Sequence, residues 1–181
     1  MDLQTKSSEY AIIPQKVLNL IIYGSEKVGK KTLICQFRNF SKLPLNFLHN
    51  ITNNDIIEAI GLHNNISIKI TFHIVNNIEN LTNFCCKLIN PFIFIIYSTY
   101  NEHFFKDLNE NITHLLKCKR KYLIRNIIGS ILNKDNCGFN SVVQNFCNVS
   151  EFNAFEFNFF DKNEEKSIFF REIENSLISG T

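Results

Sequence analysis

The chain has 181 residues, a length that suits one domain with a substantial core and is too short for two ordinary domains. Hydrophobic residues make up 45% of the chain and charged residues 20%, which excludes an intrinsically disordered protein. The formal net charge of +2 is too small to indicate nucleic acid or an anionic membrane surface as a partner.

The composition also decides which motifs are informative. The chain has 26 Asn and 26 Ile but only 6 Gly, a bias that follows AT-rich codons rather than a special physical role for Asn. A pattern made of Asn, Ile, Lys or Phe therefore arises easily by chance, whereas a pattern that requires Gly is informative.

Signals for secretion or membrane attachment are not expected. Residues 1–10 are too polar for a signal peptide, residue 2 is Asp rather than Gly, and the last residues hold no Cys for a lipid. The apolar run around Phe92–Tyr97 is far shorter than a transmembrane helix. The six Cys show no CxxC spacing, so we expect free, buried thiols, with Cys85 and Cys86 packed in the core, in a cytoplasmic protein. We predict a flexible segment over residues 1–15 and a single domain over residues 16–181.

The first two elements are a strand and a helix. Lys16–Tyr23 is an almost continuous apolar run that ends at Gly24, which is typical of a strand buried on both faces of a parallel sheet. Lys31–Phe40 then carries apolar residues at helical spacing.

A hairpin is predicted next. Asp55–Gly61 and Ile66–Val75 are strand-like, and Asn64 and Asn65 between them tolerate positive φ. This hairpin would add one antiparallel edge strand to the sheet.

The rest of the chain alternates between helices and strands. Helices are expected over Ile78–Leu88, Asn101–Lys119, Ser141–Cys147 and Asn163–Ile178, and strands over Pro91–Ser98, Tyr122–Ile131 and Phe152–Phe160. In the last helix, the residues expected to face inward are Ile168, Phe169, Ile173 and Leu177. Such alternation predicts an α/β domain with a mainly parallel sheet and helices on both faces.

One motif carries chemistry. The segment GSEKVGKKT contains GxxxxGK directly after the first strand and directly before the first helix. Gly24 would end the strand at a tight turn, and Gly29 would let the backbone approach a pyrophosphate. Loop amides and the helix N-terminus attract phosphate, and Lys30 would reach the outer phosphates. Chance gives this pattern in only about one or two per cent of such chains. We therefore predict a phosphate-binding P-loop formed by Gly24, Ser25, Glu26, Lys27, Val28, Gly29, Lys30, Lys31 and Thr32.

The motif departs from the usual P-loop at Lys31. The usual loop continues with Ser or Thr, whose hydroxyl holds Mg²⁺. Thr32 comes one residue late and lies about 100° further around the helix. A second ammonium group could partly replace the charge of a metal, but it cannot coordinate one. We therefore assign no metal-binding residue, and the change argues against Mg²⁺-dependent hydrolysis.

The segment Lys16–Phe40 and the order of the later elements resemble the Ras superfamily of small GTPases, and Rab-like members most of all. The resemblance implies a P-loop NTPase domain with the three-layer architecture of small GTPases. It also implies GTP or GDP as the ligand, protein partners, and a role in intracellular trafficking or signalling.

The other family motifs are degenerate in this chain. Thr52 stands near the place of the switch I threonine. The aspartate, glycine and glutamine places of switch II read Ile74, Asn77 and Ile78, so groups that position water are missing. Asn133–Asp135 lies three residues late for the guanine-binding motif. The resemblance is therefore to a divergent member, or to a pseudo-GTPase, and we assign no catalytic residue.

Three functions are compatible with these observations. The first is a GTPase-like protein that binds a nucleotide with weak or no hydrolysis. The second is a nucleotide-independent scaffold subunit of a larger complex, as in centromere protein M, a kinetochore subunit with a GTPase-like fold and no working site. The third is a P-loop kinase, which would need an arginine-rich lid, and the four arginines of this chain are not clustered in the sequence.

Overall fold

The computed structural model describes residues 14, 16–48, 51, 55–89, 91–98, 123–131, 153–158 and 162–179. Several sequence predictions lie outside these residues. They are the N-terminal segment apart from residue 14, the helices at 101–119 and 141–147, Thr52 and Asn133–Asp135.

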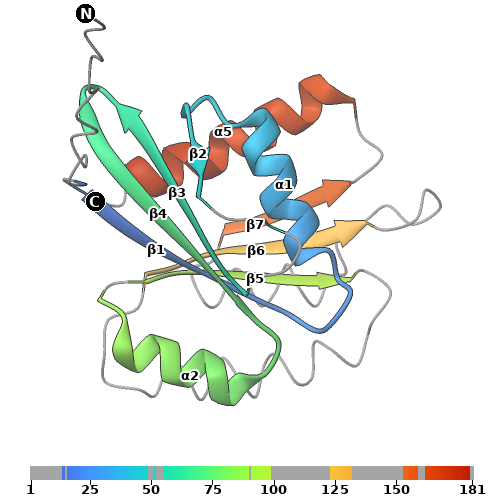
Figure 1. Ribbon diagram of the computed structural model, residues 1–181. Coiled ribbons are helices and arrows are strands. Elements are labelled where there is room, and N and C mark those ends of the chain that lie inside the picture. Colours follow the sequence, from blue (N-terminus) through green and yellow to red (C-terminus); the bar gives the residue numbers. More distant parts are fainter. Residues whose placement is uncertain are drawn as a thin grey trace, which may run out of the picture.

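The described residues form a mixed sheet of seven strands in the order β2-β3-β4-β1-β5-β6-β7 (Figure 1). β1 (Lys16–Tyr23) lies in the middle and runs parallel to β4 (Ile66–Val75) on one side and to β5 (Phe92–Ser98) on the other. β6 (Leu123–Ile131) and β7 (Asn153–Asn158) continue the parallel part. The domain is therefore α/β with a mainly parallel sheet, as the alternating elements predict.

The predicted hairpin is present at the other side of the sheet. β3 (Ile56–His63) pairs antiparallel with β4 along its whole length. The turn between them holds Asn64 at φ 49° and Asn65 at φ 65°, the left-handed values that a two-residue hairpin turn requires. The expectation that this strand forms the edge is wrong, because the two-residue strand β2 (Asn46–Phe47) pairs antiparallel outside it.

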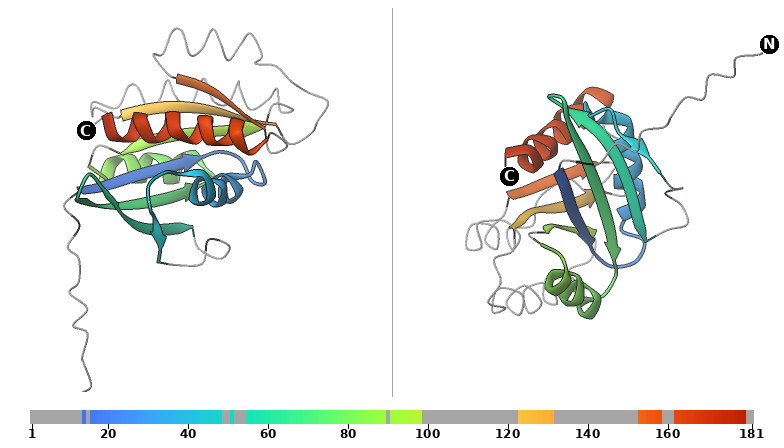
Figure 2. Two further views of the ribbon diagram at one scale, coloured as in Figure 1. Left: turned by 90° about the horizontal axis from the view of Figure 1, so that it is seen from above. Right: turned by 60° about the vertical axis from the view of Figure 1, so that its left-hand side comes forward.

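Helices cover both faces of the sheet. α1 (Lys30–Phe40) and α5 (Asn163–Ser179) lie on one face, and α2 (Ile78–Lys87) lies on the opposite face (Figures 1 and 2). In α2, Cys85 is buried as predicted, whereas Cys86 is exposed, contrary to the prediction that both pack in the core.

The core between α1, α5 and the sheet is aromatic. The ring of Phe37 on α1 meets Phe72 of β4 and Phe170 of α5 edge-on, with ring centroids 5.9 Å and 5.8 Å apart. On α5, Ile173 is buried as predicted, but Ile168 is 56% exposed and Phe170 is buried instead. The side chains of Phe169 and Leu177, also predicted to face inward, lie outside the described residues. Residues 170 and 173 are one helical turn apart, whereas residue 168 lies on another side of the helix.

The candidate site lies where the connections that leave β1 and β4 diverge. The two strands are parallel neighbours, but β1 leads into α1 on one face and β4 leads into α2 on the other (Figure 1). Neighbouring parallel strands whose connections diverge in this way leave a crevice at their carboxyl ends, where α/β proteins commonly bind ligands. The predicted P-loop lies at this edge.

Candidate functional site

Gly24 fixes the start of the loop between β1 and α1. Its N–H donates to the carbonyl of Val75 at the end of β4, at 3.2 Å. A Cβ at this position would lie 2.2 Å from the backbone oxygen of Ile96 in β5. From the sequence, a tight turn was the expected reason for this glycine. The structure shows a different reason, because Gly24 is where the loop passes close against the neighbouring strand.

The loop then reverses direction through two residues in the left-handed region. Lys27 has φ 61° and Gly29 has φ 93°. A non-glycine residue such as Lys27 costs about 1 kcal/mol or more in this conformation, and such strain is concentrated at functional sites.

The N-terminus of α1 is open to an anion. Gly29 occupies the N-cap position, makes no side-chain capping bond, and accepts the N–H of Leu33 at 2.8 Å. The first turn of α1 contains no acidic residue. The first N–H groups of the helix and its positive dipole end are therefore not compensated by α1 itself, which favours a negatively charged ligand here.

Lys30 is the most unusual side chain of the site. It is the first residue of α1, it is only 6% exposed, and its Nζ donates to the carbonyls of Gly24 at 2.7 Å and Ser25 at 2.5 Å. Burial lowers the pKa of Lys30 from 10.5 to about 8, although nearby Glu26 and Asp55 act in the opposite direction. A buried ammonium group bonded to neutral carbonyls gains more from an anion than an exposed one does.

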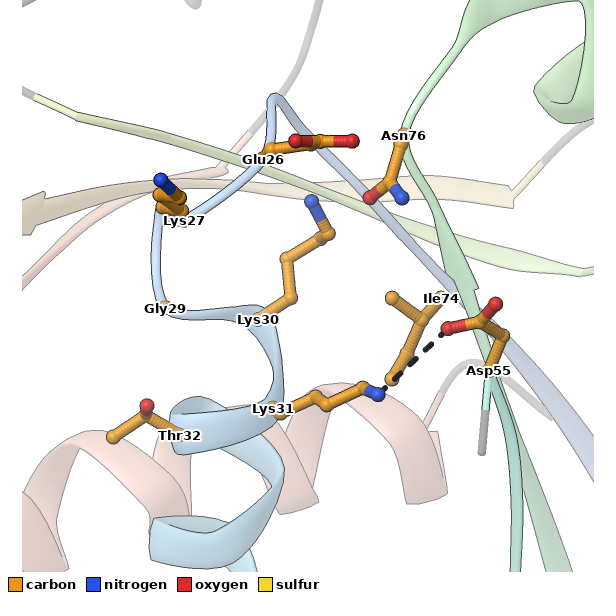
Figure 3. Close-up of a pocket in the computed structure, with 9 residues that line it drawn as sticks. All are labelled: Glu26, Lys27, Gly29, Lys30, Lys31, Thr32, Asp55, Ile74 and Asn76. Carbon is orange, nitrogen blue, oxygen red and sulfur yellow. Dashed lines mark ion pairs between the residues drawn. The ribbon is translucent and has the colours of Figure 1, made fainter. Parts of the chain in front are cut away.

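Lys31 and Thr32 point in different directions. Lys31 extends toward Asp55, the residue before β3, with Nζ 3.8 Å from Oδ1 (Figure 3). The Asp55 backbone is held in place because its carbonyl accepts the N–H of Ile74 at 2.7 Å. Thr32 is exposed and points away from Asp55, so it does not take over the position that Lys31 occupies (Figure 3).

The end of β4 forms the other wall. Ile74 is buried and lies beside Lys31 and Asp55, and Asn76 follows it (Figure 3). Asn77 has a structural role, because it is the N-cap of α2 and its side chain accepts the N–H of Asn80 at 2.8 Å. Ile78 begins α2. The residues that the resemblance would place in switch II are therefore used for packing and for starting and capping α2.

Together these segments line a cavity of about 350 Å³, within the size range of small-molecule sites (Figure 3). Six of the nine predicted site residues line it, namely Glu26, Lys27, Gly29, Lys30, Lys31 and Thr32. The other three have supporting places: Gly24 and Ser25 hold Lys30 through their carbonyls, and Val28 is 3% exposed in the core.

Asp55 and Asn76 line the cavity but were not among the predicted site residues. Asp55 lies 24 positions after Lys31, so only the pairing of β3 with β4 could have brought it to the site. Asn76 directly follows β4, which was predicted as the second strand of the hairpin but was not placed next to the β1–α1 loop. Three lysines and two carboxylates line the cavity, which leaves one excess positive charge.

The donor set does not fit a Mg²⁺ ion. Mg²⁺ requires oxygen ligands in near-octahedral geometry. The residue after Lys30 offers an ammonium group, the Thr32 hydroxyl points elsewhere, and the Asp55 carboxylate is within ion-pair distance of Lys31. Within the described ranges, no group of three or more His, Cys, Asp or Glu side chains is arranged to hold a metal.

A comparison of the sequence with protein-family models found no match, and a comparison with curated proteins found none either. In the part of the chain that the structure describes, no helix combines the length and apolar character needed to cross a membrane.

Proposed function

We propose that this protein is a divergent small-GTPase-like P-loop protein that binds a nucleotide, GTP or GDP, with weak or no hydrolysis, and acts in intracellular trafficking or signalling. One observation carries the proposal. Lys30 is buried at the uncapped N-terminus of α1, inside a cavity at the carboxyl edge of the parallel strands. This combination supplies both the fixed dipoles and the charge that phosphate groups require.

The arrangement of the sheet supports the same proposal. The chain places one hairpin after the first helix and then returns to parallel strands on the other side of β1. This is the element order on which the resemblance to small GTPases rests. The guanine base and the cellular role in the proposal depend on that resemblance.

Weak or absent hydrolysis follows from the other wall of the cavity. Hydrolysis requires a group that orients the attacking water and a metal that neutralises charge on the phosphates. The side chain of Ile74 cannot hold water in place, and Asn77 is used as a helix cap.

The proposal can be tested by acid extraction of the purified protein, with mass analysis of any released nucleotide. We expect guanine nucleotide from the wild-type protein and none from Lys30→Met. A matched control is Lys42→Met, which removes an exposed lysine of the loop after α1. Release of adenine nucleotide alone would contradict the guanine assignment. Absence of any nucleotide, together with no heat on titration of GDP, GTP, ADP or ATP, would overturn the proposal.

A second candidate is a nucleotide-independent scaffold subunit. It is favoured by the hydrogen bonds of Lys30 to Gly24 and Ser25, because they hold the loop closed without any ligand. In that case Lys30→Met would lower stability without changing any ligand response, and the protein would co-purify with a stable multi-subunit complex.

A further inference from the structure

We propose that this site binds its phosphate ligand without a divalent metal, with the Lys31 ammonium group supplying charge where other P-loop proteins place Mg²⁺. The inference rests on the proposed function, since it concerns the same cavity. It predicts that the ligand is the uncomplexed nucleotide or pyrophosphate anion.

Lys31 is placed to contact the same ligand as Lys30. Lys31 directly follows Lys30 at the start of α1, and both side chains line the same cavity (Figure 3). The two ammonium groups enter from one helix end, so their charges add to the positive end of the helix dipole. A polyphosphate placed over the loop would meet Lys30 and Lys31 at once.

The ion pair that Lys31 makes with Asp55 is weak enough to be replaced by a ligand. Its Nζ lies 3.8 Å from the Asp55 carboxylate, and the two side chains are 39% and 74% exposed. An ion pair this long and this exposed contributes little and exchanges easily. A phosphate group offers more negative charge and more acceptor oxygens than one carboxylate, so Lys31 can leave Asp55 for the ligand.

The positive charge of Lys31 also disfavours a metal ion in this part of the cavity. A divalent cation at this end of the cavity would lie near the Lys31 ammonium group, and the two like charges would repel each other. The Asp55 carboxylate, one of the two that line the cavity, lies within ion-pair distance of Lys31. On this proposal, the Lys31 ammonium group supplies positive charge at the place where the usual P-loop has a Ser or Thr that holds the metal.

The test is calorimetric titration of GDP, and separately of inorganic pyrophosphate, into the full chain at constant ionic strength. One series contains EDTA and the other contains excess Mg²⁺. We expect wild-type affinity in EDTA to be equal to or higher than that in Mg²⁺. In Lys31→Thr, which restores a hydroxyl, we expect affinity in EDTA to fall about tenfold or more. Mg²⁺ should then recover part of that loss.

Lys42→Thr is the matched control, because it removes the same charge from an exposed loop position beyond the other end of α1. It should behave as wild type in both series. The inference is overturned if the wild-type protein binds only with Mg²⁺, or if Lys31→Thr in EDTA equals wild type. Those results would leave the proposed function intact. If neither probe binds under either condition, the proposed function and this inference fail together.

Discussion

The two connections that leave the neighbouring strands β1 and β4 differ in what they retain. The β1–α1 loop has two left-handed residues, a glycine pressed against β5, and a buried lysine. On the other side, Ile74 at the end of β4 and Asn76 in the β4–α2 connection line the cavity, and Asn77 caps α2. On the function proposed above, the β1–α1 side would hold phosphate, and the β4 side lacks the groups that hydrolysis requires. The groups proposed to bind phosphate and the positions that hydrolysis would require therefore lie in separate connections.

The largest expected effect concerns the packing of the β1–α1 loop. Gly24→Ala would place a methyl group 2.2 Å from the backbone oxygen of Ile96, which cannot move without disturbing β5. We expect the free energy of unfolding, measured by denaturant titration, to fall by about 3 kcal/mol.

Gly61→Ala is the control for that prediction. Its Cβ would approach the Leu45 side chain at 2.8 Å and the Pro44 carbonyl oxygen at 3.0 Å, and the side chain can shift. A loss of about 1 kcal/mol is expected. If Gly24→Ala were as stable as Gly61→Ala, the loop would not be held against β5 as described.

The next effect concerns pH and Lys30, whose pKa is lowered to about 8 by burial. An anion binds the protonated form, so affinity for GDP should fall above about pH 8, by up to about tenfold per pH unit. The stability of the protein without ligand should change with pH in the opposite direction. The unfolded state holds the proton more tightly, so stability should rise between about pH 8 and pH 10.5.

Titration calorimetry between about pH 7 and pH 9 checks the affinity, and chemical denaturation checks the stability. Lys30→Arg keeps a charge that does not titrate in this range, so it also corrects for titration of the ligand. A wild-type profile parallel to that of Lys30→Arg would contradict the expectation that the Lys30 proton is lost near pH 8 at the cost of ligand affinity.

A smaller effect is expected in the β4–α2 connection. Asn77→Ala removes the side chain that accepts the Asn80 N–H, so stability should fall by about 1 kcal/mol, while GDP affinity stays unchanged. Asn77→Gly should cost only a few tenths of a kcal/mol, because glycine is tolerated at an N-cap. A clear loss of affinity in either variant, with the fold intact, would mean that this connection does sense the ligand.

The smallest effect concerns Asp55. Asp55→Asn should change stability by less than about 0.5 kcal/mol, because the pair with Lys31 is long and exposed. Affinity for GDP should rise about threefold, since a competing anion is removed from the cavity. Reduced affinity would indicate that Asp55 holds Lys31 in its binding position.

Much of the fold could be predicted because the local signals are strong. The limits of β1 and β4 match the predicted ones, since β1 is an apolar run that ends at Gly24 and β4 is a β-branched, alternating stretch between Asn65 and Asn76. The hairpin turn was predictable from the tolerance of Asn64 and Asn65 for positive φ. β2 was not, because a two-residue strand exists only through its pairing with β3.

The candidate site was predictable only where it is local in sequence. The loop and Lys30–Thr32 form one motif, whereas Asp55 reaches the cavity through pairing between strands. The role of Gly24 was also misjudged, because the contact that requires it comes from β5, more than 70 residues later. Residues that act through distant contacts leave no spacing pattern to read.

The central claim is that the β1–α1 loop still binds a nucleotide through Lys30. The most direct measurement is calorimetric titration of GDP into wild-type protein, Lys30→Met and Lys42→Met, with the thermal midpoint of each confirming that it is folded. We predict saturable binding by wild type and Lys42→Met, and an affinity at least about a hundredfold lower for folded Lys30→Met. Equal binding by all three proteins, or none by the folded wild type, would contradict the claim.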